Sequence, residues 1–557
     1  MYILGINGFG ERSHDASACL FKDSRLIAFV EEERLVRKKH AYNLLPHNAI
    51  KFCLNKEGIS ETQIDLVAVG WNYKKMYKKI KKIINKNVFL KQLFPKSLFK
   101  KINPGVVFVN HHRAHASSAF RCSGFAEAAV LVIDGQGEEE STSIWNTKKG
   151  ELKLVKKFPI KDSIGYFYEA ATEFLGFSPD QYGKTMGLSS YGSPSYCFDN
   201  VIKLLSQGYL FKIHPKKNPT LDEQKSVREE WLKIFNVLLP QKKPEFIFDR
   251  ISLQFERNVR FSRDHKDFAA SIQKQTNSLI CHLVKVAINL TGKKNVCIAG
   301  GVGLNCVANG KILEDKLCHR LFIQPLSNDA GVSLGAALEV LESKGIRGVG
   351  GLIKNYYMGP EFSNREIKEI LKRKGLSFEY VHNPSRVGAE LINQGKIIGW
   401  FQGKMEAGPR ALGNRSIIAN PSKKEFKDLT NIIKKRELWR PLCPSILEKD
   451  ISEYVKEKSL SPFMTFNFNI KRGVLKKIPA VVHIDKTARV QTVNKNLNPR
   501  YWSLISEFKK LSGKGIVLNT SLNSKNEPIA CTPEDALRNL YDSQMDALII
   551  GNYLIRK

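Results

Sequence analysis

The sequence predicts an α/β protein with two domains. Short apolar runs that end at Gly or Asp, such as residues 128–135 and 295–301, are typical of buried strands that lead into loops. Helical patterns separate these runs, and the longest is amphipathic, from Phe268 to Leu290. The 557 residues exceed what one compact core usually holds, so two large domains are expected.

The domain boundary is expected in the glycine-rich stretch 345–351, because such stretches join domains. We therefore predict one domain over residues 1–350 and a second over residues 353–557. Residues 196–263 are basic and lose the alternation of strands and loops, which we interpret as a mostly helical insertion in the first domain.

Composition indicates a soluble cytoplasmic protein with an unusual charge. No run approaches the ~18 apolar residues of a membrane span, and the first residues lack the basic lead of a signal peptide. The ten cysteines form no Cys-x-x-Cys pair, which fits a reducing compartment. The formal charge of +34 favours polyanionic partners such as nucleic acid, although a merely solubilising surface also accounts for it.

The segment 71–101 has no acidic residue and one apolar face at helical spacing. Such a helix can follow phosphates, lie on an anionic membrane surface, or pack on a core with its lysines in solvent. The residues of the apolar face are Tyr73, Met76, Tyr77, Ile80, Ile83 and Ile84.

Two histidines, His111 and His115, have the spacing that places both imidazoles on one face of a helix. There they can share a divalent metal, although a structural histidine pair has the same spacing. A third, anionic ligand is expected from a distant part of the chain. Asp329 is the best candidate, because it lies in a polar loop that opens a helix of small residues.

Three glycine-rich loops can accept phosphate, because glycine lets the backbone N–H groups approach a ligand. Tight turns also need glycine, so one loop alone is weak evidence. The residues expected to contact a nucleotide in these loops are Gly8, Asp134, Gly135, Gly137, Gly300, Gly301, Gly303 and Asn305. Three loops in one α/β domain resemble the plan of actin-like ATPases, and the absence of Gly-x-x-x-x-Gly-Lys-Ser/Thr argues against a P-loop enzyme.

A series of motifs in order along nearly the whole chain resembles the NodU-type O-carbamoyltransferase family, which includes antibiotic and nodulation-factor carbamoyltransferases. The matching segments are residues 13–17, 31–34, 111–116, 183–188, 300–305, 329–337, 408–416, 440–441, 485–491 and 519–523. Two positions depart from the family pattern, since Lys486 and Asn526 stand where glycine is usual. The charged and amide residues around both positions remain, so we do not interpret the departures as loss of activity.

The resemblance implies an actin-like first domain, with duplicated ribonuclease-H-like halves and a metal site that is usually iron. It implies a YrdC-like second domain that uses ATP, with Mg²⁺, to convert carbamoyl phosphate into carbamoyl adenylate and pyrophosphate. An acceptor hydroxyl then attacks the carbamoyl carbonyl in the first domain. Lys184 lies in a matching motif and is expected to bind the nucleotide.

The resemblance also implies roles for individual side chains. Five cations of the second domain are expected to bind phosphate groups, although arginines can also stabilise a fold. They are Arg410, Arg415, Lys434, Arg440 and Arg489. Asn519, Ser521 and Asn523 are expected to bind a carbamoyl group or ribose, or else to cap a helix. In the first domain His14 is a candidate general base or a structural loop residue, and Lys39 with residues 31–34 is expected to line the acceptor pocket.

The acceptor is the least determined part of the prediction. The leading hypothesis is a hydroxymethyl pyrimidine in DNA, such as hydroxymethylcytosine, because a sugar acceptor gives no reason for the +34 charge. A hydroxyl of a glycan or a small molecule is the alternative. A non-catalytic nucleic-acid-binding descendant and a tRNA threonylcarbamoyl enzyme are further alternatives, and the sequence does not determine the oligomeric state.

Overall fold

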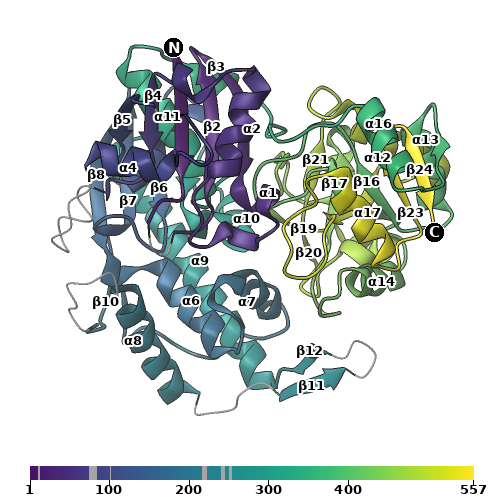
Figure 1. Ribbon diagram of the computed structural model, residues 1–557. Coiled ribbons are helices and arrows are strands. Elements are labelled where there is room, and N and C mark those ends of the chain that lie inside the picture. Colours follow the sequence, from purple (N-terminus) through teal and green to yellow (C-terminus); the bar gives the residue numbers. More distant parts are fainter. Residues whose placement is uncertain (11–12, 74–84, 101, 216–222, 240–244, 250–253) are drawn as a thin grey trace. The chain divides into compact units, whose positions relative to one another are not determined.

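A computed structural model describes residues 1–10, 13–73, 85–100, 102–215, 223–239, 245–249 and 254–557 (Figure 1). The chain forms two compact units, Met1–Lys243 with Arg263–Tyr356, and Pro244–Ser262 with Tyr357–Lys557. Most of the apolar face predicted for the segment 71–101 falls on residues 74–84, outside the described residues. None of the described helices is long and apolar enough to cross a membrane.

The first unit contains two five-stranded sheets with the same strand order. One sheet has the order β3-β2-β1-β4-β5, and its strands are β1 (Tyr2–Asn7), β2 (Ser17–Lys22), β3 (Arg25–Glu31), β4 (Leu66–Val69) and β5 (Gly105–Phe108). The other has the order β14-β13-β6-β7-β8, and its strands are β6 (Ala129–Ile133), β7 (Glu140–Lys148), β8 (Glu151–Pro159), β13 (Asn295–Ala299) and β14 (Arg320–Ile323).

In each sheet the first three strands run antiparallel, and the remaining two run parallel to the first. This repeated arrangement is that of duplicated ribonuclease-H-like halves in an actin-like fold. The predicted α/β class and the actin-like first domain are confirmed.

Two helices join the halves of the first unit. Helix α5 (His111–Cys122) follows β5 and packs on β6 and β13, whereas α11 (Ala330–Ser343) follows β14 and packs on β1, β2 and β4. The helices also pack on each other. A Cβ atom at Gly335 would lie 1.9 Å from the carbonyl oxygen of Ala114, so only glycine permits this close contact. The packing of α5 on α11 brings the N-terminal ends of the two helices close together.

The segment 196–263 differs from the mostly helical insertion that we predicted. Its described residues form the hairpin β9–β10, one helix, and the hairpin β11–β12, whose residues cluster with the second unit. Aromatic residues such as Tyr209 and Phe211 favour strands, and residues 206–207 form the turn of the first hairpin, in which Gly208 pairs with Leu205. The bounds are β9 (Ile202–Leu205), β10 (Gly208–Phe211), α8 (Glu223–Leu238), β11 (Glu245–Asp249) and β12 (Gln254–Arg260).

The predicted helix 268–290 lies within α9 (Arg263–Thr291). Its apolar face, including Phe268, Leu279 and Leu283, is buried, which explains the amphipathic pattern. The remaining helices of the unit are α1 (Glu32–Val36), α2 (His47–Glu57), α4 (Lys86–Leu93), α6 (Ile164–Phe174), α7 (Tyr182–Ser189) and α10 (Cys306–Glu314).

The second unit is a mixed α/β domain around one eight-stranded sheet with the order β15-β24-β23-β16-β17-β22-β18-β21. Its strands are β15 (Glu379–Tyr380), β16 (Ile398–Phe401), β17 (Arg415–Ala419), β18 (Cys443–Leu447), β21 (Gln491–Val493), β22 (Ile516–Ser521), β23 (Ala547–Ile550) and β24 (Tyr553–Arg556), with β19 (Asn467–Asn469) and β20 (Thr487–Arg489) in a separate pair. Its helices are α12 (Asn364–Arg373), α13 (Pro384–Asn393), α14 (Glu425–Ile433), α15 (Ile451–Tyr454), α16 (Pro499–Ser512) and α17 (Pro533–Tyr541). Trp400, Tyr501 and Phe508 belong to its buried core.

Candidate functional site

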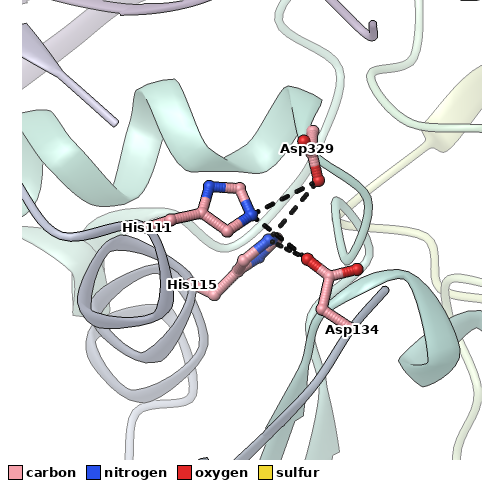
Figure 2. A group of neighbouring side chains, drawn as sticks. All are labelled: His111, His115, Asp134 and Asp329. Atoms are coloured by element: carbon pink, nitrogen blue, oxygen red, sulfur yellow. Dashed lines mark hydrogen bonds and ion pairs between the residues drawn. The ribbon is translucent and has the colours of Figure 1, made fainter. Parts of the chain in front are cut away.

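Four buried side chains meet where α5 and α11 begin (Figure 2). His111 and His115 come from α5, Asp329 precedes α11, and Asp134 follows β6. The Nε2 atoms of the two histidines lie 3.1 and 3.2 Å from Oδ2 of Asp134. They lie 3.6 and 3.7 Å from Oδ1 of Asp329. The structure thus brings the three predicted metal ligands together and adds Asp134.

Neighbouring groups fix the direction of two of these side chains. Nδ1 of His111 lies 3.2 Å from the carbonyl oxygen of Gly70, which favours a proton on Nδ1 and leaves the Nε2 lone pair facing the carboxylates. The indole ring of Trp71 stacks on the His111 ring at 3.7 Å between centroids. Oδ1 of Asp134 accepts the backbone N–H groups of Gly135 and Gly301, so its Oδ2 points at the histidines.

The cluster has the chemistry of a divalent transition-metal site. Metal–ligand bonds of about 2.1 Å place neighbouring ligand atoms roughly 3–3.5 Å apart around a cation. The distances between the histidine Nε2 atoms and the carboxylate oxygens are close to this range. Without a cation the charges compensate one another. Burial acts to lower the pKa of His115, but hydrogen bonds to Asp134 and Asp329 outweigh it and raise that pKa to about 9. Burial opposes ionisation of Asp134, yet His111 and His115 hold its pKa well below the usual range.

His14 lies beside this cluster and belongs to a chain of polar contacts. Its Nε2 is 4.0 Å from Oδ2 of Asp329, and its Nδ1 is 3.2 Å from Oδ2 of Asp15. The other oxygen of Asp15 lies 2.8 Å from Nδ1 of His40. The surrounding protein acts to lower the pKa of His14, whose side chain is 46% exposed, but Asp329 and Asp15 outweigh it and raise the pKa to about 10. The Tyr42 ring lies 6.1 Å from the His14 ring.

The glycines of the predicted phosphate-binding loops differ in backbone conformation and in what their N–H groups contact. Gly8 and Gly300 are in the left-handed region, and a Cβ atom at Gly300 would lie 2.3 Å from the carbonyl oxygen of Ile133. The N–H groups of Gly135 and Gly301 bind Asp134, so in this state they do not face a phosphate.

The other residues predicted to bind the nucleotide occupy several environments. Gly137 lies against His112, and Gly303 donates its N–H to the carbonyl oxygen of Gly300. Asn305 caps α10 and exchanges hydrogen bonds with Gln273. Lys184 is buried in α7 near the ring of Phe177, and Lys39 begins a short 3₁₀ turn.

Three arginines of the second unit gather near Cys443. Nη2 of Arg489 donates to Sγ of Cys443 at 3.0 Å, and Arg440 lies 3.6 Å from Oε2 of Glu437. Burial and the neighbouring Arg440, with a smaller contribution from Arg489, lower the pKa of Arg436 to about 9, against the opposing effects of Cys443 and Glu437. We call Arg436, Arg440 and Arg489 the arginine cluster. An anion bound there would offset the repulsion between its guanidinium groups.

One further cation of the predicted set, Arg415, holds the fold instead. Arg415 is fully buried, and its Nη1 and Nη2 atoms donate to backbone carbonyl oxygens while its guanidinium stacks on Phe401. The acceptors are those of Gln402, Asn414, Pro360 and Gly403. Because these bonds occupy both terminal nitrogens, the prediction that Arg415 binds phosphate does not fit its position. Arg410 is half-buried in the same loop.

Lys434 and the predicted carbamoyl-binding residues also form a local network. The Lys434 ammonium donates to the carbonyl oxygens of Ser521 and Asn523 at 2.6 and 2.9 Å, and to Oδ1 of Asn523 at 2.7 Å. Asn519 is 1% exposed, and its Nδ2 donates to Ser445, Gln491 and the carbonyl oxygen of Ala411. Lys434 therefore fixes the loop that follows β22, and Asn519 lies inside the domain.

Sequence reasoning missed two contributions to these clusters. Asp134 was predicted as a nucleotide-loop residue, and only the packing of β6 against α5 places its carboxylate beside the histidines. Arg436 lies between Lys434 and Arg440 in a basic run, a signal that pointed to the right segment.

Family models match most of the chain. The model described as "Carbamoyltransferase N-terminus" matches residues 2–338, and the one described as "Carbamoyltransferase C-terminus" matches residues 389–557. Nodulation protein NolNO of Sinorhizobium fredii (strain NBRC 101917 / NGR234) is 34% identical over 98% of this chain and 79% of its own length. Nodulation protein NolO of Bradyrhizobium diazoefficiens is 34% identical over 81% of this chain and 79% of its own.

A solved structure, component A of (R)-2-hydroxyglutaryl-CoA dehydratase from Acidaminococcus fermentans, is 14% identical, with a TM-score of 0.35. The similarity covers 62% of this chain and 99% of that one. At this TM-score the fold assignment rests on the strand order described above.

Proposed function

The chain belongs to the carbamoyltransferase family, and on that premise we propose that it transfers a carbamoyl group from carbamoyl adenylate to an acceptor hydroxyl. The two matching family models confirm the resemblance to carbamoyltransferases that the sequence motifs indicated. The observation that supports the transfer step most strongly is the buried group of His111, His115, Asp134 and Asp329.

The second unit, which we predict to be YrdC-like, is proposed to form the adenylate from carbamoyl phosphate and ATP with Mg²⁺. Water releases inorganic phosphate from carbamoyl phosphate, and an oxygen of the resulting carbamate attacks the α-phosphate of ATP and displaces pyrophosphate. Both substrates are polyanions, so their approach needs fixed positive charge. The arginine cluster supports this proposal, because burial and like charges lower the pKa values of Arg436 and Arg440, and a bound anion would offset that repulsion. Lys434 contributes indirectly by holding Ser521 and Asn523.

In the first unit, two imidazoles and two carboxylates suit a divalent first-row metal, and Fe²⁺ is the ion that the family resemblance implies. When bound, such a cation would supply positive charge to the carbamoyl carbonyl or to the adenylate phosphate. The N-terminal ends of α5 and α11 add partial positive charge at the same place.

His14 is proposed to take the proton of the acceptor hydroxyl, which requires a neutral imidazole. The carboxylates beside His14 raise its pKa to about 10 when no cation is bound. Neutralisation of Asp329 by a bound cation would remove part of that effect and lower the pKa toward neutrality. Metal binding and base function are therefore expected to depend on each other.

A sugar hydroxyl is the acceptor that the side chains around His14 favour. Tyr42 is half-exposed near His14, and Asp180 lies 3.8 Å from His40. Phenol and carboxylate groups accept hydrogen bonds from hydroxyls, whereas carboxylates repel phosphate. A hydroxymethyl pyrimidine in DNA remains the second candidate, because the net charge of +34 favours a polyanion.

One assay tests both halves of the proposal. The full chain is incubated with ATP, carbamoyl phosphate, Mg²⁺ and Fe²⁺, with a panel of oligosaccharides in one arm and hydroxymethylcytosine DNA in the other. We expect pyrophosphate release that depends on carbamoyl phosphate, and a mass gain of one carbamoyl group on an oligosaccharide. A gain only on DNA would select the second acceptor, and no pyrophosphate release in either arm would refute the activation step.

A further inference from the structure

Glu138 lies in the loop that begins at Asp134, and its side chain is buried with 3% of its surface exposed. Both carboxylate oxygens accept hydrogen bonds from donors outside that loop. Oε1 accepts the backbone N–H of Asn72 at 2.7 Å and that of His111 at 3.0 Å. Oε2 accepts the His111 N–H at 3.1 Å and Nδ2 of Asn110 at 2.5 Å.

These donors belong to the two segments that orient the His111 ring. Asn110 is the N-cap of α5, and His111 is its first residue. Asn72 follows Gly70, which accepts from Nδ1 of His111, and Trp71, which stacks on its ring. One carboxylate therefore connects the start of α5, the segment after β4, and the loop that carries Asp134.

We propose that Glu138 is a positioning residue for the candidate metal centre, holding His111 in place relative to Asp134. The inference rests on the proposed function, since it assumes that the buried cluster binds a cation. Glu138 faces donors at both oxygens and the start of a helix, where a negative charge is favourable. Outer-shell contacts of this kind tune metal affinity through the direction of the ligand.

Replacing Glu138 with glutamine tests the role with almost no change in volume. Either orientation of the amide would turn an NH₂ group toward a donor, the N–H of Asn72 and His111 or the Nδ2 of Asn110. Glu139→Gln is the matched control, because it removes the same charge from the next residue, which pairs with Lys157 at 2.9 Å.

The experiment titrates the purified, metal-free full chain with Co²⁺ and records its visible absorption bands. We expect Glu138→Gln to weaken Co²⁺ binding by about tenfold or more and to change the band positions. We expect Glu139→Gln to bind as the wild type does. Absorption is measured without substrate, so the readout does not depend on activity.

A second variant decides the question if Glu138→Gln fails to fold. Asn110→Ser keeps a good N-cap but removes the Nδ2 donor to Glu138 and to Glu140. The lost bond to Glu138 is expected to lower affinity by about fivefold, the equivalent of one hydrogen bond. Absence of Co²⁺ binding by the wild type would overturn the metal site itself. Wild-type Co²⁺ binding with unchanged affinity in the folded variants would overturn only the positioning role of Glu138.

Discussion

The buried group of His111, His115, Asp134 and Asp329 in the first unit and the arginine cluster of the second differ in how their charges are compensated. In the first group two histidines face two aspartates, and the pKa of His115 rises to about 9 because pairing with the carboxylates outweighs burial. In the arginine cluster, burial and like charges lower the pKa of Arg436 to about 9. The histidines of the first group must lose their extra protons before they can bind a cation. In the arginine cluster, a bound anion would directly reduce the repulsion between the guanidinium groups.

Two arginines of the second unit differ in what surrounds their guanidinium groups. Arg489 and Arg415 lie in equally charged motifs, yet Arg489 lies in the arginine cluster and Arg415 donates to carbonyl oxygens inside the domain. Their substitution should therefore affect different quantities, one the chemistry and the other the stability.

The largest effect is expected from His115→Ala. The variant loses one of the four proposed ligands, and we expect metal affinity to fall more than about a hundredfold, beyond the loss typical of outer-shell changes. Carbamoyl transfer should fall with it, while pyrophosphate release from ATP and carbamoyl phosphate should persist. Metal content and pyrophosphate release measure the two effects, with His382→Ala in the second unit as control. Equal loss of both activities would contradict the assignment of separate steps to the two clusters.

Arg489→Ala should have the reverse pattern. Removing one guanidinium from the proposed phosphate site is expected to slow pyrophosphate release about a hundredfold, because it removes charge stabilisation from the reaction. Metal content should stay at the wild-type level. Arg373→Ala is the control, since Arg373 lies on the surface and pairs with Glu534. Wild-type rates of pyrophosphate release in Arg489→Ala would remove the arginine cluster from the activation step.

Arg415→Met should lower the free energy of unfolding and leave pyrophosphate release by the folded protein nearly unchanged. Methionine fills much of the volume but leaves carbonyl oxygens of Gln402 and Pro360 without a donor, so we expect a loss of about 2 kcal/mol in the free energy of unfolding. Denaturant unfolding measures it, and Arg365→Met on the exposed face of α12 is the control. A stable variant that has lost pyrophosphate release would instead return Arg415 to the phosphate site.

The sequence predicted the grouping of His111, His115 and Asp329 better than it predicted the arginine cluster, and the reason is physical. Helical spacing determines that His111 and His115 share a face, and a loop before a small-residue helix pointed to Asp329. Asp134 completes the group through the packing of the two halves, which no local pattern encodes.

In the second unit, motif position did not distinguish the arginines that gather in the arginine cluster from Arg415, which donates to carbonyl oxygens inside the domain. Arg415 lies in a strand whose side chains are all buried, and its acceptors are backbone carbonyl groups that any sequence supplies. Glu138 and Arg436 were missed for the related reason that their roles depend on distant donors and neighbouring charges. The fold class was predictable because strand patterns are local, whereas the helical prediction for residues 196–263 failed where short hairpins replaced helix.

The last prediction is the pH dependence of metal binding, and it follows from charge compensation between the histidines and the aspartates. The folded-state pKa of His115 is raised from 6.5 to about 9, so its contribution to metal-free stability is complete below pH 6.5 and is lost as pH rises through about 9. A cation needs the neutral imidazole, so Co²⁺ affinity should rise over the same range, by up to about tenfold per pH unit. Thermal unfolding of the metal-free chain and Co²⁺ titration across this range measure the opposite trends. Affinity that does not change with pH would mean that His115 is already neutral, and that the carboxylates do not hold its proton.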